Sequence, residues 1–256
     1  MSASEVHTLG VDSSNAAKIC RAMAGDGLSM EYQPIFDLQD GSVVGVEALA
    51  RFTMEPRQGP AAWFDEARRF GLGLDLETAA AKAALARVTD LPPKVFLSVN
   101  ASSEAAESAA LAQLLWASRP DRVVLEIRSG EAAEGDGLAE GLDRVRAMGV
   151  GLALDEVGDD QKTFARLLAL EPDYVKLDIG LCRNIHLDPV RQLAVQRLLV
   201  QATGSGATVV AVGIQARGEI EALRDLSISQ GQGYFMAVPT PVPFPSFASV
   251  PTLTRS

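Results

Sequence analysis

Short apolar runs recur along the chain, and most of them end in one polar or charged residue before a helix-like stretch begins. The run Val43–Phe52 carries Glu47 and Arg51, and the run at 95–100 ends in Asn100. Nearly continuous apolar strands that are separated by helices are typical of a parallel sheet covered by helices. About eight such runs are present, so the sequence predicts an α/β fold in which a TIM-like (β/α)8 barrel closes on itself.

The first two runs differ from the rest because a tight turn joins them. Residues 30–38 read as a strand, and Gln39-Asp40-Gly41 reads as a hairpin turn into Val43–Phe52. Strands joined this closely are antiparallel, so we expect an irregular barrel with an antiparallel first strand. A doubly wound open sheet is the alternative, but no Gly-x-Gly-x-x-Gly follows a strand.

The expected organisation has three parts. Residues 1–27 are expected to form a leader and a short helix, residues 28–242 the barrel, and residues 243–256 a proline-rich tail. Within the barrel, strands are expected at 95–100, 123–127, 150–155, 174–178, 208–213 and 231–235. Helices are expected at 60–70, 75–88, 103–116, 163–170, 189–203 and 216–226, with one more ending at Met148.

Charge and hydropathy exclude some functions. The net charge of −10 argues against binding duplex nucleic acid, which needs a basic surface. No apolar run reaches the roughly 18 residues needed to span a bilayer, and the first residues do not resemble a signal peptide. We therefore expect a soluble cytoplasmic protein with no membrane partner, in which Cys20 and Cys182 are buried thiols.

Polar side chains gather at the predicted strand ends, and a closed barrel brings these ends to one face. Carboxylates and an amide oxygen are the ligands of a hard divalent cation such as Mg²⁺, Mn²⁺ or Ca²⁺. So many carboxylates would repel one another unless a metal or a lysine neutralised them. The set consists of Glu47, Asn100, Glu126, Asp155, Glu156, Lys176, Asp178 and Gln232.

The ordered motifs resemble those of the EAL domains, metal-dependent phosphodiesterases that hydrolyse cyclic di-GMP, and their non-catalytic relatives. The resemblance covers about residues 28–242. No single motif is specific, but the ordered set is. The motifs are Tyr32-Gln33-Pro34-Ile35, Glu47-Ala48-Leu49-Ala50-Arg51, Ser98-Val99-Asn100-Ala101-Ser102, Leu125-Glu126-Ile127, Leu154-Asp155-Glu156-Val157-Gly158, Lys176-Leu177-Asp178 and Gln232-Gly233-Tyr234.

The resemblance implies a role for each matching residue. It implies that a first metal is held by Glu47, Asn100, Glu126 and Asp155. Glu156 stands where the family has an aspartate that helps to hold a second metal. Lys176 matches the lysine beside the attacking water. The positions implied to contact the dinucleotide or its metals are Gln33, Leu49, Arg51, Asp178 and Gln232.

Departures from the family pattern fall on the catalytic residues. Where the family has A-E-G-V-E, residues 211–215 read A-V-G-I-Q, so Val212 replaces the proposed general base and Gln215 the second glutamate. An aliphatic side chain cannot accept a proton from water. Ser129 replaces the glutamate that anchors the catalytic loop, and residues 155–163 carry charged residues where the family has small ones.

These departures predict a degenerate, non-catalytic EAL domain, with Lys176 as the one retained catalytic residue. It would act as a cyclic di-GMP receptor or through a regulatory protein partner, and it would bind Mg²⁺ or Mn²⁺ weakly; Ca²⁺ inhibits the family. The alternative is an active phosphodiesterase that yields pGpG, in which Glu156 or Asp178 serves as base. The resemblance also implies a homodimer through the helix at 163–170, although core packing explains its apolar residues equally well.

Overall fold

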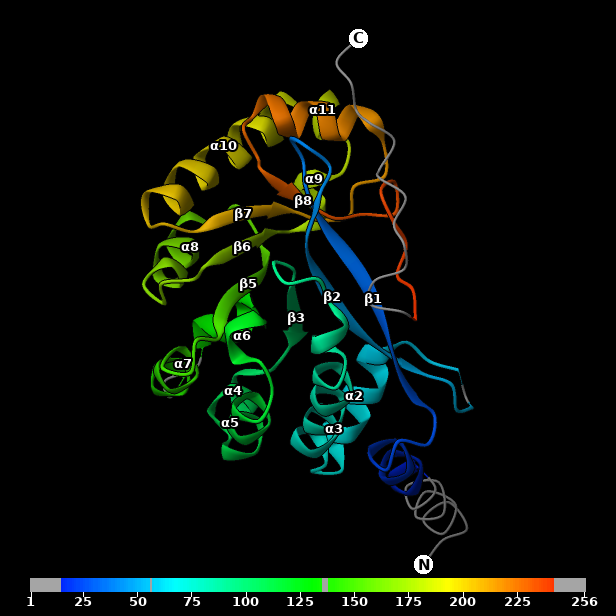
Figure 1. The fold of residues 1–256 in the computed structure, drawn as a ribbon. Helices are drawn as coiled ribbons and strands as arrows, with labels where there is room; N and C mark the ends of the chain where they lie inside the picture. The colour runs from blue at the N-terminus through cyan, green and yellow to red at the C-terminus, as the bar shows by residue number, and fades with distance from the viewer. Residues whose placement is uncertain (1–14, 56, 135–137, 242–256) are drawn as a thin grey trace, which may run out of the picture.

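The strands form one closed barrel, in the order β1 to β8 (Figure 1). The computed structural model describes residues 15–55, 57–134 and 138–241. Strand β1 is antiparallel to both β2 and β8, whereas every other neighbouring pair is parallel. The predicted irregular barrel with an antiparallel first strand is confirmed, and the open sheet is excluded.

Turn chemistry sets the geometry of the first hairpin. Strand β1 (Leu28–Asp37) is followed by β2 (Val43–Phe52). The Asp37 carboxylate accepts hydrogen bonds from the Gln39 and Asp40 amides, and Gly41 has a φ of 75°, which an L side chain rarely adopts. In the resulting register Gln33 lies opposite Glu47, so two predicted site residues are neighbours across the hairpin.

The later strands alternate with helices on the outside of the barrel (Figure 1). The strands are β3 (Phe96–Asn100), β4 (Val123–Arg128), β5 (Gly151–Val157), β6 (Tyr174–Leu177), β7 (Thr208–Ala211) and β8 (Gln230–Gly231). The main helices are α2 (Pro60–Arg69), α3 (Gly73–Leu85), α4 (Ser103–Glu107), α5 (Ala109–Trp116), α6 (Ser129–Glu134), α7 (Leu138–Arg146), α8 (Gln161–Leu168), α9 (Ile179–Cys182), α10 (Pro189–Gly204) and α11 (Arg217–Asp225).

Several expectations need correction. The helix expected at 103–116 is two helices, because the Ser108 hydroxyl accepts from the Leu111 amide and starts a new helix at Ala109. The strand expected at 174–178 ends at Leu177, because Asp178 caps α9 instead. Cys20 is exposed, whereas Cys182 is buried as expected. The proline-rich tail lies outside the described residues.

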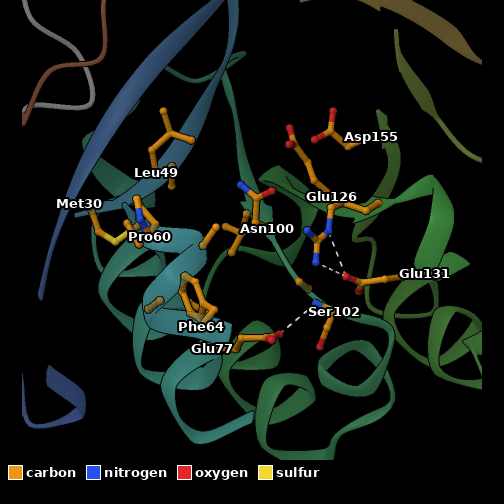
Figure 2. A pocket seen from close by; sticks show the side chains of 18 of the residues that line it. Met30, Leu49, Pro60, Phe64, Glu77, Asn100, Ser102, Glu126, Glu131 and Asp155 are labelled. Atoms are coloured by element: carbon orange, nitrogen blue, oxygen red, sulfur yellow. Dashed lines mark hydrogen bonds and ion pairs between the residues drawn. The ribbon is translucent and has the colours of Figure 1, made fainter. Parts of the chain in front are cut away.

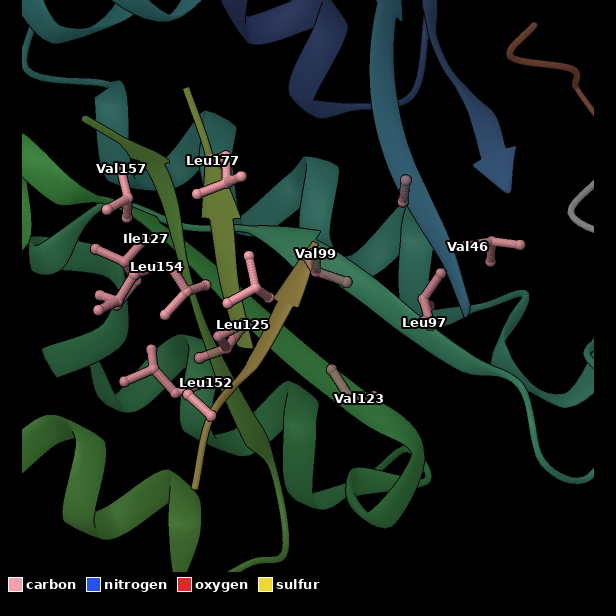
Figure 3. Packing of buried hydrophobic residues seen from close by; sticks show 14 of the residues in the cluster. Val46, Leu97, Val99, Val123, Leu125, Ile127, Leu152, Leu154, Val157 and Leu177 are labelled. Carbon is pink, nitrogen blue, oxygen red and sulfur yellow. The ribbon is translucent and has the colours of Figure 1, made fainter. Parts of the chain in front are cut away.

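Each strand divides its side chains between two faces, as the strand period of two requires. Leu125 and Ile127 of β4 are fully buried in the core between the strands and helices, together with Leu97 and Leu152 (Figure 3). The alternate position, Glu126, lies on the interior face of the barrel. The aliphatic layer therefore holds the strands in register and fixes the carboxylates that alternate with it.

Among the helices of residues 15–55, 57–134 and 138–241, none has the length and apolar character that a membrane span requires.

Removing a side chain from the aliphatic layer tests this arrangement. Leu125→Ala should lower the free energy of unfolding by about 2–5 kcal/mol, because it leaves a cavity in the packed core. Leu187→Ala is the control, since that leucine is 73% exposed and should change stability by less than about 0.5 kcal/mol. Urea denaturation of both variants measures the difference, and equal effects would contradict the assigned packing.

Candidate functional site

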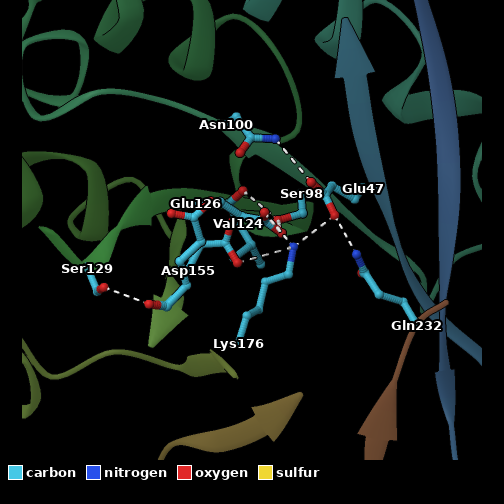
Figure 4. A network of polar contacts seen from close by, with 10 residues as sticks. Glu47, Ser98, Asn100, Val124, Glu126, Ser129, Asp155, Lys176 and Gln232 are labelled. Atoms are coloured by element: carbon cyan, nitrogen blue, oxygen red, sulfur yellow. Dashed lines mark hydrogen bonds and ion pairs between the residues drawn. The ribbon is translucent and has the colours of Figure 1, made fainter. Parts of the chain in front are cut away.

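A buried ammonium group lies at the centre of the polar residues in the barrel mouth (Figure 4). Lys176 Nζ lies 2.8 Å from Glu47 Oε2, 2.7 Å from Glu126 Oε2 and 4.0 Å from Asp155 Oδ1. The Lys176 side chain is 3% exposed, so these carboxylates provide its charge compensation. Four strands, β2, β4, β5 and β6, thus supply one charged cluster.

Amide and hydroxyl donors complete the network around the carboxylates. Asn100 Nδ2 donates to Glu47 Oε1 at 3.2 Å, and Gln232 Nε2 donates to Glu47 Oε2 at 2.7 Å. Ser98 Oγ donates to Glu126 Oε1 at 2.5 Å. Sequence reasoning missed Ser98, although it precedes Asn100 by two residues on β3 and could have been placed by strand alternation.

The two buried glutamates are pushed in opposite directions by their surroundings. Burial and the Glu47 charge raise the pKa of Glu126 to about 8, with Lys176 opposing. Burial also acts against ionised Glu47, but the Lys176 charge and three hydrogen-bond donors outweigh it and lower the pKa of Glu47. The carboxylates raise the pKa of Lys176 despite its burial, so the ammonium stays protonated.

Two pockets open from this network at the carboxyl ends of the strands. The central pocket, of about 470 Å³, is lined by Glu47, Lys176, Val212 and Gln232, among others. The outer pocket, of about 320 Å³, extends between β2, β3, α2 and α3 to apolar side chains including Met30, Pro60 and Phe64 (Figure 2). Both pockets share Leu49, Asp155 and Glu156, so they form one continuous site.

The structure places the remaining predicted ligand-binding residues around this site. Gln33 lines the central pocket and donates to the Ala237 carbonyl at 3.2 Å. Arg51 lines the outer pocket, where its Nε lies 2.7 Å from Glu31 Oε2. Asp178 lines the central pocket, but its Oδ1 accepts from the Gly180 amide at 2.7 Å.

The residues that depart from the family pattern also lie at the site. Val212 and Gln215 line the central pocket, which Lys176 and Asp155 also line. Ser129 Oγ donates to the carbonyl of Glu156 at 2.9 Å, and Glu156 has a φ of 54°, which is uncommon outside glycine. Gln215 Oε1 accepts a hydrogen bond from Arg183 Nη1. The carboxyl end of β5 is therefore held through its backbone by a hydroxyl.

The donor chemistry fits a hard divalent cation. Glu47, Asn100, Glu126 and Asp155 offer carboxylate and amide oxygens on adjacent strands, and buried Gln232 Oε1 has no hydrogen-bond partner among the described residues. Lys176, however, already lies between two of the carboxylates. Within the described part of the chain, no three Asp, Glu, His or Cys side chains are arranged as a metal site.

Comparison with known proteins identifies the family. The sequence model of the EAL domain family matches residues 16–239. The chain belongs to the EAL domain family. It is 28% identical over 228 residues to a cyclic di-GMP phosphodiesterase of Pseudomonas aeruginosa, covering 84% of this chain and 38% of that protein. It is 26% identical over 240 residues to the phosphodiesterase RocR of the same organism, covering 89% and 61%.

Solved EAL domains share the fold. The FimX EAL domain of Xanthomonas citri, in complex with cyclic di-GMP, superposes with a TM-score of 0.84 at 18% identity, over 94% of this chain and 99% of that chain. Klebsiella pneumoniae BlrP1, in a manganese and cyclic di-GMP complex, gives 0.74 at 26% identity, over 84% and 57%. The EAL chain spans less than two thirds of the curated relatives described above.

The raised pKa of Glu126 predicts how stability depends on pH in the absence of metal. The folded state holds this proton more tightly than the unfolded state, so the stabilisation is complete below about pH 4.5 and is lost as the pH rises to about 8. The pKa of Glu47 is lowered, so its contribution has the opposite sign. That stabilisation is present above the ordinary pKa of a glutamate and is lost only as the pH falls below it.

Glu126→Gln should therefore flatten the fall of unfolding free energy between pH 5 and 8, as measured by urea denaturation with EDTA present. Glu221→Gln, at an exposed site on α11, should keep the wild-type slope. If the Glu126→Gln protein retains that slope, the buried carboxyl is not its source.

Proposed function

We propose that this EAL domain binds cyclic di-GMP in the combined pocket without hydrolysing it, and so acts as a receptor in cyclic di-GMP signalling. The observation that carries the proposal is Val212, an aliphatic residue at the position of the family's general base, in a pocket that keeps its oxygen donors. Loss of a general base alone costs about 10²–10⁴-fold in rate.

The other carboxylates of the central pocket are poorly suited to replace that base. Glu47 accepts hydrogen bonds from three side chains, and Asp178 accepts from its own helix. Asp155 lies within 4.0 Å of the Lys176 ammonium. Glu156 is exposed and is the remaining candidate for the alternative, an active phosphodiesterase.

We further propose that Mg²⁺ or Mn²⁺ binds weakly. Glu47, Asn100, Glu126 and Asp155 would hold the ion, with Glu156 toward a second one, and a bound ion would neutralise the carboxylates and polarise a water. Two of these carboxylates are hydrogen-bonded to Lys176, which favours the metal-free state. The role proposed for Lys176 in this receptor is to compensate the buried charge.

The setting of the receptor is also a proposal: a cytoplasmic location and a regulatory protein partner. A homodimer through α8 has less support, because Phe164 and Leu167 of that helix are buried in the core and Leu168 is partly buried against it. Core packing accounts for the apolar pattern there.

Restoring the missing base tests the non-catalytic assignment. Val212→Glu, combined with Gln215→Glu and Ser129→Glu, should raise Mn²⁺-dependent hydrolysis of cyclic di-GMP at least about 10²-fold over the wild-type chain. Val212→Ile in the wild-type background is the control and should leave the product level unchanged. Chromatographic assay of pGpG measures both. A wild-type chain that already turns over, and loses this activity in Glu156→Gln, would instead establish the phosphodiesterase.

A further inference from the structure

Arg128 ends strand β4 and lines the outer pocket together with Glu126 and Asp155 of the charged network. It follows Glu126 by two residues, so strand alternation places both side chains on the same face of β4. In the register of β4 and β5, Arg128 pairs with Asp155, as Asn100 of β3 pairs with Glu126. Its side chain lines the outer pocket, and it is the residue that follows the Leu125-Glu126-Ile127 motif.

One carboxylate oxygen holds the Arg128 guanidinium. Arg128 Nε donates to Glu131 Oε1 at 3.0 Å, and Nη2 donates to the same oxygen. Glu131 belongs to α6 and lies at the edge of the pocket (Figure 2). Nη1 makes no hydrogen bond within residues 15–55, 57–134 and 138–241. The Arg128 side chain is 50% exposed, so water and an entering anion can reach its pairing with Glu131.

Each of the other two arginines of the outer pocket has two partner residues. Arg51 donates to Glu31 at 2.7 Å and to the Ala50 carbonyl at 3.0 Å. Arg68 lies 2.5 Å from an oxygen of Asp65 and 3.6 Å from one of Glu77. Their side chains are also less exposed, at 32% and 41%. Arg128 therefore has one partner residue to leave, whereas Arg51 and Arg68 each have two, and its side chain is the most exposed of the three.

The outer pocket is rich in acidic residues, so an anionic ligand that enters it needs an arginine that can leave its own partner. Acidic residues outnumber arginines among its lining residues by six to three, and by five to three when Glu126, whose pKa burial raises to about 8, holds its proton. A cyclic dinucleotide brings two further negative charges on its phosphodiesters, and each must find a cation when it leaves water. A guanidinium can meet a phosphate with two parallel hydrogen bonds, which makes it well suited to this role.

We infer that Arg128 is a ligand-binding residue of this site, which leaves Glu131 and binds a phosphodiester of the cyclic dinucleotide. The inference rests on the proposed receptor function. It assigns Glu131 the role of a stand-in anion, which occupies the guanidinium while no ligand is bound and releases it when a phosphate enters.

Isothermal titration of the chain with cyclic di-GMP, in the presence of Ca²⁺, tests this assignment. Arg128→Ala should weaken binding roughly 10- to 100-fold, the range expected when a charge-assisted hydrogen bond is removed. Glu131→Gln should tighten binding, because it removes the competing anion. The affinity of the wild-type chain should fall more steeply with added KCl than that of Arg128→Ala.

Arg119→Ala is the matched control, because Arg119 also pairs with a single carboxylate, that of Asp121, and lies just before β4 at the other end of the strand. It should leave the affinity unchanged, and melting temperatures should show that all variants fold. Binding by Arg128→Ala within twofold of wild type would overturn the inference, as would weaker or unchanged binding by Glu131→Gln. A wild-type chain that binds no cyclic di-GMP would instead overturn the receptor function on which the inference rests.

Discussion

The pairing of the buried Lys176 ammonium group with the carboxylates of Glu47, Glu126 and Asp155 organises the polar network of the barrel mouth. Lys176 reaches the centre of the barrel from β6, and Glu47 and Glu126 reach it from β2 and β4. Each group alone would be costly to bury, but together they compensate one another. The aliphatic layer outside the strands makes this possible, because it fixes the strand register that brings the three side chains together.

The same pairing links metal binding, protonation and catalysis in this chain. A divalent ion would compete with Lys176 for its carboxylates and with a proton for Glu126, whose pKa burial and the Glu47 charge raise to about 8. In an active phosphodiesterase, a bound metal activates a water molecule and a general base then takes its proton. Val212 supplies no base, so the proposed role of the site is reduced to recognising a ligand.

Sequence patterns could predict much of this architecture because it depends on local rules. Strand and helix periodicity predicted the closed barrel, and the Gln39-Asp40-Gly41 turn predicted its antiparallel first strand. Asn100 and Glu47 were expected at one face, and they lie within hydrogen-bonding distance there. The break at Ser108 was not expected, because apolar periodicity continues across it and only the cap reveals it.

Interactions that depend on side-chain direction across strands could not be read from the sequence. The Arg128 and Glu131 pair has an ordinary helix-surface spacing, and only the register with Asp155 places it over the site. The hydrogen bond from the Gly180 amide to Asp178 likewise became visible only in three dimensions.

A single measurement tests the central claim most directly: incubation of the pure chain with cyclic di-GMP and Mn²⁺, followed by chromatography of the ligand recovered with the protein. The account predicts intact cyclic di-GMP in the bound fraction, whereas pGpG formed at a rate that Glu47→Ala abolishes would contradict it.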